Sequence, residues 1–431
     1  MGIRILELND KIKNNILENM LKRSPSSYRE HEETVREIIA NVRKDGDKAI
    51  FAYAEKFDGV SLNADNFRVS EEEIKEALSE VGDELLGVMK RSMENIRAFH
   101  EKQVRQSFFT TKEDGSILGQ RITPIARVGV YVPGGKAVYP SSVLMNVVPA
   151  LVAGVPEIVM TTPCGKDGKI NANVLAAAHI LGIKEIYKTG GAQAIAALAF
   201  GTESIAKADK IVGPGNIFVA LAKREVYGHV SIDSIAGPSE IMVLADETAN
   251  AHFVAADLLS QAEHDEMASS ILVTNSEKLA KEVSDEIDGY LKKLSRSQII
   301  EKSLENYGYA LVAASMDEAI DVVNEIASEH LEIVTANPWE TMTKVKNAGA
   351  IFLGSYSSEP LGDYFAGPNH VLPTNGTAKF FSPLSVDDFI KKSSVISYSK
   401  EALEKVHKDI EAFAKAEGLT AHANSIAVRF E

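Results

Sequence analysis

The feature that most constrains this chain is a long alternation of β-rich runs with alanine-rich helical runs, beginning at Arg127. The series opens with RVGVYVPGG, SSVLMNVVPALVAG and EIVMTTP, and continues through EIYKTGG, AQAIAALAFG and KIVGPG. Repeated strand-helix-strand order is typical of a mostly parallel sheet with helices on its faces. A second series runs from EIMVLAD to AIFLGSY. We therefore predict an α/β protein with two Rossmann-like domains, plus small N- and C-terminal helical segments.

The predicted domain organisation follows from these two series. A chain of 431 residues is long enough for about two to four domains. We predict that the first series is inserted into the other. The predicted parts are an N-terminal helical segment (1–24), a discontinuous α/β domain (25–127 and 239–380), an inserted α/β domain (128–238) and a C-terminal segment (381–431). That last segment carries a helical run, SKEALEKVHKDIEAFAKAEG, and a final strand-like run, SIAVRF.

Charge and composition exclude several classes of protein. The chain has 46 basic and 61 acidic residues, a net charge of −15, which argues against a nucleic-acid partner. The single cysteine, Cys164, excludes an intrachain disulfide and fits a reducing compartment. The N-terminal residues lack the apolar core of a signal peptide. The most apolar stretch, Val143–Met160, is interrupted by polar residues and prolines and predicts a buried helix followed by a strand. We expect a cytoplasmic protein without a membrane partner.

Three loops follow strands of the first series and are candidates for a nucleotide site. The usual G-x-G-x-x-G fingerprint is missing. In its place stand VYVPGG (130–135), KTGGAQAIA (188–196) and VGPGN (212–216). Each could bring backbone N–H groups to a phosphate, and each could equally be a tight turn. Three such loops at successive strand ends of one sheet favour a ligand of nucleotide size.

A second group of residues could bind metal. Gln261 and His264 end an apolar helix three positions apart, so they share a face. Asp363 is a lone acid in the Gly- and Pro-rich stretch 359–383, a loop of the kind that often carries binding residues. Such nitrogen and oxygen donors suit zinc, although manganese and cobalt would also accept them. Taken alone, the Gln-x-x-His pair is a weak signal, and a core or surface role is the simpler interpretation.

Proton transfer has one candidate pair. Glu329 and His330 stand at a helix-to-strand boundary, where a buried glutamate and a histidine could act as acid and base. The simpler interpretation is a helix end with a capping histidine. Cys164 precedes a polar turn without an adjacent histidine, and we interpret it as passive rather than as a nucleophile.

Together these stretches resemble histidinol dehydrogenase, an enzyme family of histidine biosynthesis. The matching pieces include VGVYVPGG, TGGAQAIAALAFGTE, VGPGN, DSIAGPSEIMVLAD, DLLSQAEHD, SEHLEI, GDYFAGPNHVLPT and GLTAHANSI. They extend from about residue 128 to 427 in the order that the family has. The resemblance therefore covers most of the chain.

The resemblance implies a set of site residues. One Zn²⁺ per subunit would be bound by Gln261, His264, Asp363 and His422, with His422 contributed by the partner subunit of an obligate homodimer. Glu329 and His330 correspond to the catalytic acid/base residues. The remaining implied contacts are those to substrate (Ser239, His370 and Glu417, besides His330 and the zinc ligands) and those to NAD (Tyr131, Gln193 and Asn216).

The resemblance also implies a reaction. L-histidinol would be oxidised through L-histidinal to L-histidine with two NAD⁺, His330 taking the alcohol proton and Glu329 activating water to attack the aldehyde. Three alternatives remain open at this point. A related zinc- and NAD-dependent enzyme could oxidise another primary alcohol, such as a sulfonated diol. The chain could also be a zinc hydrolase, in which the three glycine-rich loops have no role, or a non-catalytic metal-binding scaffold.

Overall fold

The computed structural model describes residues 2–22, 29–134 and 139–431. The chain divides into two compact units, the first made of Met1–Gln103 with Ile125–Phe389 and the second of Val104–Pro124 with Ile390–Glu431. Among the described residues, we find no helix with the length and apolar character needed to cross a membrane.

The first unit contains a six-stranded sheet in the order β1-β11-β10-β9-β12-β13, in which every neighbouring pair is parallel. The strands are β1 (Arg4–Glu7), β9 (Glu240–Ala245), β10 (Ser269–Thr274), β11 (Gly308–Val312), β12 (His330–Val334) and β13 (Ala350–Leu353). The central strands are buried on both faces, which explains why their sequences are nearly continuous apolar runs. β1 was not expected from the sequence.

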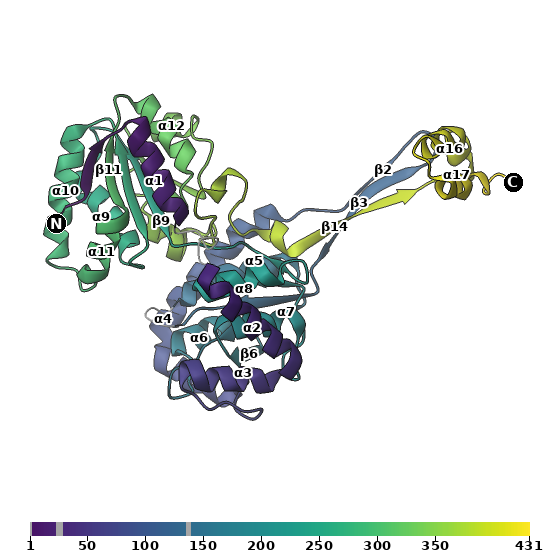
Figure 1. The fold of residues 1–431 in the computed structure, drawn as a ribbon, viewed down its shortest axis with the longest axis horizontal. Helices are drawn as coiled ribbons and strands as arrows, with labels where there is room; N and C mark the ends of the chain where they lie inside the picture. The colour runs from purple at the N-terminus through teal and green to yellow at the C-terminus, as the bar shows by residue number, and fades with distance from the viewer. Residues whose placement is uncertain (1, 23–28, 135–138) are drawn as a thin grey trace. The chain divides into compact units, whose positions relative to one another are not determined.

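Helices cover both faces of this sheet (Figure 1). The helices on one face are α9 (Ala251–Ala262), α10 (Glu277–Leu291) and α11 (Ser297–Tyr307), and those on the other are α1 (Asp10–Lys22) and α12 (Met316–Ile326). The strand order runs from β9 through β10 to β11 in one direction and from β12 to β13 in the other. The order therefore reverses between β9 and β12, and the short α13 (Pro338–Met342) connects β12 to β13.

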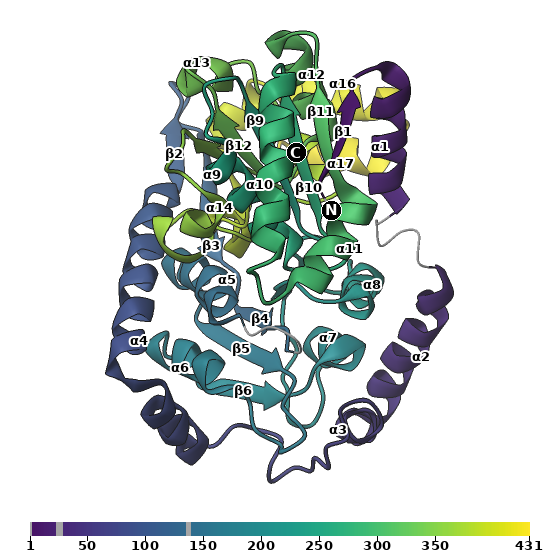
Figure 2. The same ribbon diagram turned by 90° about the vertical axis from the view of Figure 1, so that its left-hand side faces the viewer.

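A five-stranded parallel sheet, in the order β6-β5-β4-β7-β8, also lies in the first unit. Its strands are β4 (Arg127–Tyr131), β5 (Glu157–Thr162), β6 (Glu185–Lys188), β7 (Lys210–Val212) and β8 (Ser231–Ile232). Figure 2 shows its helical layers, which are α4 (Glu71–His100), α5 (Pro140–Ala153) and α6 (Ala172–Ile180) on one face and α2 (Arg29–Asp45), α3 (Asp47–Tyr53), α7 (Gly191–Phe200) and α8 (Ile217–Val226) on the other.

Local sequence signals explain several of these elements. α4 begins at a capping box, in which the Ser70 side chain accepts from the Glu73 N–H and the Glu73 carboxylate accepts from the Ser70 N–H. α5 and β5 confirm the buried helix and strand predicted for Val143–Met160. Since α5 packs against β4, α4 and α6, it is apolar on nearly all sides.

The second unit combines a small antiparallel sheet with three helices. The sheet has the order β14-β3-β2, with β2 (Phe108–Thr111), β3 (Ile117–Pro124) and β14 (Ile390–Ser397), and the helices are α15 (Lys400–Glu404), α16 (His407–Ala416) and α17 (Thr420–Ala427). The prediction of a strand for SIAVRF is wrong, because α17 runs through it to Ala427. Packing of α17 on α16, with Ala423 buried between them, outweighs the short strand-like pattern.

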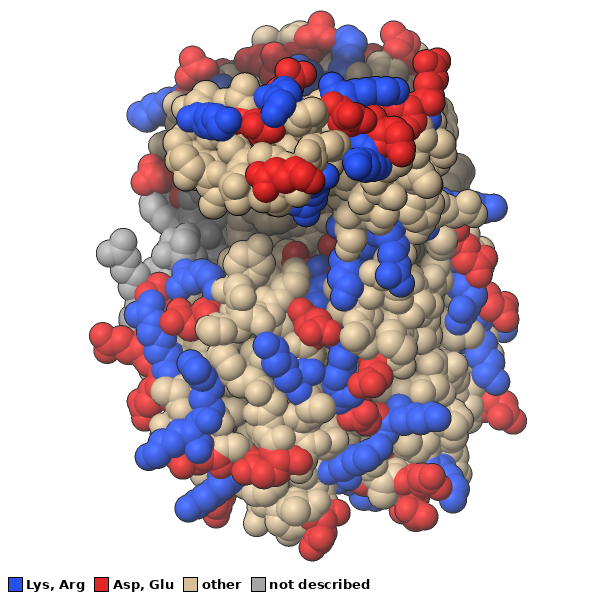
Figure 3. Space-filling model, turned by 90° about the vertical axis from the view of Figure 1, so that its right-hand side faces the viewer, with Lys and Arg blue, Asp and Glu red and all other residues tan. Residues whose placement is uncertain are grey.

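The predicted fold class, two Rossmann-like parallel sheets with terminal helical segments, is confirmed. The exact domain boundaries stay a prediction. Figure 3 shows that acidic and basic side chains are interspersed on the face that it presents, despite the net charge of −15.

Candidate active site

The Glu329–His330 pair lies at the amino end of β12 and is fixed by the neighbouring strand β9. α12 is followed by Ala327 in the left-handed region, with φ 55°, and this turn directs the chain into β12. The Glu329 carboxylate accepts from the Glu240 N–H at 2.9 Å. Nδ1 of His330 lies 3.0 Å from the Glu240 carbonyl oxygen. Since that oxygen only accepts, Nδ1 carries a hydrogen, and the neutral ring has Nε2 as its free acceptor.

Burial and mutual charge shift the pKa of both residues. Burial raises the pKa of Glu329 to about 8, although the neighbouring His330 acts in the opposite direction. Burial lowers the pKa of His330, but the carboxylates of Glu329 and Asp363 outweigh it and raise that pKa to about 10. His330 lies between the two acids, with Nδ1 at 3.7 Å from Glu329 Oε2 and Nε2 at 3.8 Å from Asp363 Oδ1. The pair therefore places two titratable groups with shifted pKa values side by side, an arrangement typical of acid/base sites.

Asp363 reaches this pair from the Gly- and Pro-rich stretch. It belongs to a single π-helical turn, η4 (Gly362–Ala366), and its Oδ1 lies 3.4 Å from Nδ1 of His370. Burial raises the pKa of Asp363, but the two histidines hold it well below its usual range. A cavity of about 570 Å³ is lined by His330, Asp363 and His370. The structure thus brings together three of the residues predicted for catalysis and substrate.

Gly349 shows how tightly the Glu329–His330 pair is packed. It precedes β13, and a Cβ atom at this position would overlap the carbonyl oxygen of Glu329. The backbone N–H groups of Gly349 and Ala350 also donate to the Ser328 and Glu329 carbonyls, at 3.0 and 2.8 Å. The close approach of these two segments requires glycine and fixes the start of β12.

Three side chains with metal-binding atoms converge beside His330. Ligand atoms of His264, Glu359 and Asp363 all lie within 4.8 Å of one another. Burial lowers the pKa of His264, which favours the neutral ring that metals bind. Glu359 was not singled out by the sequence analysis. The available signal was its spacing, because Glu359 stands four residues before Asp363, at the start of the short α14 (Glu359–Leu361).

Gln261 lies one helical turn before His264, whose N–H donates to the Gln261 carbonyl at 3.1 Å. Its side chain is fully buried, and neither Oε1 nor Nε2 has a hydrogen-bond partner among the described residues. A buried amide without partners is costly unless a ligand satisfies it. The residues present therefore fit a metal ion bound by His264, Asp363 and the Gln261 oxygen.

Further carboxylates lie behind this set. Burial, followed by the charge of Asp363, raises the pKa of Glu359 to about 7. Glu359 accepts from Ser260 Oγ at 3.0 Å, and its N–H donates to Glu332 at 2.8 Å. Burial and the adjacent Asp257 raise the pKa of Glu332 well above its ordinary value. This acidic cluster is unusually dense for a protein interior.

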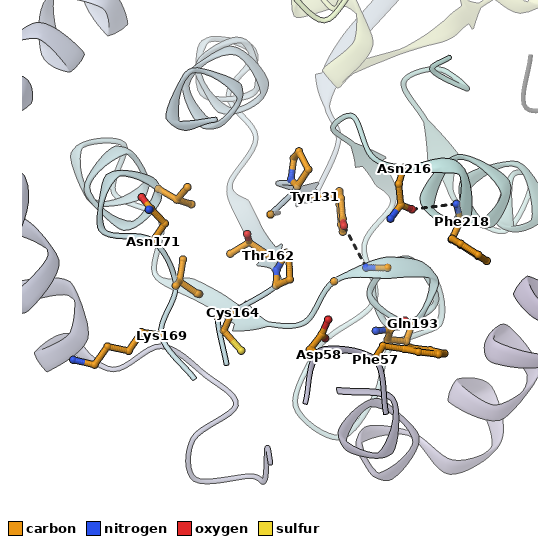
Figure 4. Close-up of a pocket in the computed structure, with 18 of the residues that line it drawn as sticks. Phe57, Asp58, Tyr131, Thr162, Cys164, Lys169, Asn171, Gln193, Asn216 and Phe218 are labelled. Carbon is orange, nitrogen blue, oxygen red and sulfur yellow. Dashed lines mark hydrogen bonds between the residues drawn. The ribbon is translucent and has the colours of Figure 1, made fainter. Parts of the chain in front are cut away.

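The second cavity lies at the carboxyl ends of the five-stranded sheet and measures about 890 Å³, within the range of ligand pockets. All three predicted glycine-rich loops line it, and Figure 4 shows Tyr131, Gln193 and Asn216 around it. The Gly191 N–H donates to the Tyr131 hydroxyl at 3.2 Å. Gln193 Oε1 is buried and has no hydrogen-bond partner in the described chain. Gly135, predicted in the first loop, lies outside the described residues.

The remaining predicted residues occupy different places. Asn216 caps α8, and Ser239 immediately precedes β9. Cys164 lines the larger cavity, and burial raises the pKa of its thiol, which keeps it protonated and agrees with a passive role. Glu417 and His422 are exposed residues of the second unit, at the end of α16 and within α17.

Comparison with known proteins gives a consistent result. A family model described as histidinol dehydrogenase matches residues 21–430. The histidinol dehydrogenase of Geobacillus kaustophilus is 60% identical over 406 residues, which cover 94% of this chain and 95% of that protein. The Bacillus subtilis enzyme is 58% identical over 410 residues, with 95% and 96% covered. The crystal structure of histidinol dehydrogenase from Elizabethkingia anophelis has a TM-score of 0.93 at 38% identity, and the match covers 99% and 98% of the two chains.

Proposed function

The chain belongs to the histidinol dehydrogenase family of oxidoreductases, and on that premise we propose how its residues oxidise L-histidinol through L-histidinal to L-histidine. The proposed reaction uses two NAD⁺ and one zinc ion per subunit. The observation that carries this proposal is the arrangement around His330, whose two ring nitrogens face Glu329 and Asp363 at 3.7 and 3.8 Å. An acid/base pair beside a cluster of metal-binding atoms suits the stepwise oxidation of an alcohol.

In the proposed metal site, Gln261, His264 and Asp363 of one subunit bind zinc together with His422 of the partner subunit. The unsatisfied side chain of Gln261 and the convergence of His264 with Asp363 support this assignment. When bound, the zinc supplies a template for the nitrogen donors of the substrate and positive charge that offsets Asp363. Glu359 lies close enough to His264 and Asp363 to hold either ligand in position.

In the proposed mechanism, His330 accepts the hydroxyl proton of the alcohol at Nε2 while hydride passes to NAD⁺. The bond from Nδ1 to the Glu240 carbonyl keeps the ring in the required tautomer. Glu329 then removes a proton from water as that water attacks the aldehyde. NAD⁺, when bound, would supply the hydride acceptor for each of the two oxidations. Each proton transfer by a positioned residue is worth about 10²–10⁴-fold in rate.

Ser239 and His370 are the proposed substrate contacts from the same subunit. Ser239 immediately precedes Glu240, whose backbone holds the catalytic pair, and His370 contacts Asp363. The proposed partner contribution is Glu417 together with His422. Large apolar side chains of the second unit support a dimer, because those of Phe108, Ile396 and Phe413 are more than half exposed in the single chain.

The proposed NAD site is the larger cavity, with Tyr131, Gln193 and Asn216 as contacts. They come from three loops at the carboxyl ends of β4, β6 and β7, where parallel sheets commonly bind nucleotides. The buried Gln193 oxygen, which has no partner within the described ranges, supports a ligand in this place.

The test is the amount of NADH formed per L-histidinol consumed, measured before and after chelation of metal. Two NADH per substrate, lost on chelation and restored by zinc, are expected. NADH formation from a sulfonated diol but not from histidinol would move the substrate to another primary alcohol. Turnover that needs no nucleotide would contradict the proposed cofactor.

A further inference from the structure

A buried ion pair lies beneath one of the proposed cofactor loops. Lys223 of α8 and Asp233, just after β8, form an ion pair in which the two side chains are 2% and 4% exposed. Neither residue was singled out by the sequence analysis, and neither lines the cavity. The pair lies between the loop after β7 and the segment that leads from the five-stranded sheet to β9.

Both members of the pair bind the same backbone residue. Lys223 Nζ donates to the Gly213 carbonyl oxygen at 3.0 Å, and the Gly213 N–H donates to Asp233 Oδ2 at 2.8 Å. Gly213 has a φ of 116°, and a Cβ there would overlap the carbonyl oxygen of Tyr131. The pair thus holds Gly213 by both its N–H and its C=O, pressed against Tyr131 and three residues before Asn216.

The Asp233 carboxylate has one more contact, with the residue that follows it in the chain. Its Oδ1 accepts from the Ser234 N–H at 2.7 Å. Ser234 begins the segment SIAGPS, which ends at Ser239, and Gly237 within it donates to Thr374 Oγ1 at 2.8 Å. One carboxylate therefore fixes the cofactor loop and the beginning of the segment that carries Ser239.

We propose that the Lys223–Asp233 pair is a positioning device that sets the geometry of the NAD site by holding Gly213 between Tyr131 and Asn216. This inference rests on the proposed NAD function. A buried ion pair is weak evidence for stability, because apolar residues of similar volume often replace one without loss. Its hydrogen bonds to one loop residue make it suited to fix a backbone conformation.

The experiment compares breaking this pair with breaking a second set of ion pairs, which lies at the amino end of β4 in the same sheet. Arg127, at the amino end of β4, bonds Glu157 and Glu185, each at 2.7 Å, and its side chain is 10% exposed. The two glutamates are 60% and 32% exposed, so Arg127→Met removes ion pairs of a buried cation that are remote from the cofactor loops. It controls for a general loss of stability.

In the Asp233→Asn variant, we expect the KM for NAD to rise about tenfold, since a displacement of about 1 Å can cost about 10²-fold. The kcat at saturating NAD should change by less than about twofold, and zinc content should stay at the wild-type value. A double variant, Lys223→Met with Asp233→Leu, leaves no buried charge unpaired and should show the same rise in KM. Arg127→Met should lower the melting temperature with KM unchanged.

Two results would overturn the positioning role. One is an unchanged KM for NAD in the folded double variant, and the other is an equal rise in Arg127→Met. Equilibrium titration of the wild-type protein with NAD separates this inference from the proposed function. If the wild type oxidises histidinol without binding NAD, the proposed cofactor is wrong. If the wild type binds NAD with the same affinity as the double variant, only the positioning role of the ion pair is wrong.

Discussion

The two cavities of the first unit are built at opposite ends of their strands. The larger cavity lies at the carboxyl ends of β4, β5, β6 and β7, where loops lead into helices. Glu329 and His330 stand instead at the amino end of β12, beside the amino end of β9. Gln261 and His264 reach the same edge because α9 returns antiparallel to the strands before β10.

This difference corresponds to a difference in chemistry. The carboxyl-end cavity, proposed for NAD, is lined by glycine-rich loops and by the uncharged side chains of Gln193 and Asn216, with few charged groups among them. The amino-end site concentrates carboxylates and histidines on rigid elements, and their pKa values depart strongly from the ordinary ones. General placement rules for α/β sheets therefore point to the proposed nucleotide site, while electrostatics point to the proposed acid/base groups.

The largest expected effect is a loss of zinc in variants of the amino-end site but not in a variant of the carboxyl-end cavity. Asp363→Ala or His264→Ala should lose most of the zinc and reduce activity to background, because each removes a proposed ligand. Asn216→Ala should keep one zinc per subunit and raise the KM for NAD about tenfold, the loss of roughly one hydrogen bond. Metal analysis of the purified proteins gives the answer. Full zinc content in Asp363→Ala would contradict the ligand assignment.

The next effect lies within the amino-end site and separates its two half-reactions. Glu329→Gln should slow aldehyde oxidation by about 10²–10⁴-fold, because only that step needs an activated water. Oxidation of the alcohol should fall much less, since His330 remains. Supplying L-histidinol or L-histidinal in single turnovers measures each step separately. Equal losses in both steps would rule out this division of labour.

A third contrast concerns pH. In the proposed mechanism Glu329 acts as a base, which requires its ionised form, and its pKa is raised to about 8. Aldehyde oxidation should therefore rise about tenfold per pH unit below that value and level off above it. The pKa of Tyr131 is raised to about 12 by burial, so the KM for NAD should stay constant over the same range. A rate profile that is unchanged in Glu329→Gln would show that another group titrates.

The sequence predicts the carboxyl-end site better than the amino-end site. The three loops are local patterns, and parallel strands necessarily bring their carboxyl ends to one edge, so the cavity follows from the fold class. The pair Glu329–His330 is also adjacent in sequence. Its attachment to Glu240, 90 residues away, depends on the register of β12 with β9, which no local pattern specifies.

Other features were out of reach for the same reason. Glu359 becomes relevant only through its distance to His264, and Gly349 only through its contact with Glu329. β1 pairs with β11 across about 300 residues, so its place in the sheet has no local signature. The assignments of Gln261 and Asp363 came from a family resemblance, since Gln-x-x-His alone is a weak pattern. Local residue patterns do not contain information on contacts between residues that are far apart in the sequence.

The smallest expected effect tests whether the dense carboxylates of the amino-end site oppose folding. Glu332 is almost fully buried, and burial and Asp257 raise its pKa well above the unfolded value. The folded state thus holds its proton more tightly, so this group contributes stability at low pH that is lost as pH rises above its unfolded pKa. Glu332→Gln keeps an oxygen to accept from the Glu359 N–H and removes the charge. Its melting temperature should exceed that of the wild type by about 1–3 °C at alkaline pH, with a smaller gain near pH 5.

The control is Lys169→Met, which breaks an exposed ion pair beside the other cavity. It should show no such pH-dependent gain in melting temperature. If the gain in melting temperature of Glu332→Gln did not grow with pH, the charge of Glu332 would not oppose folding.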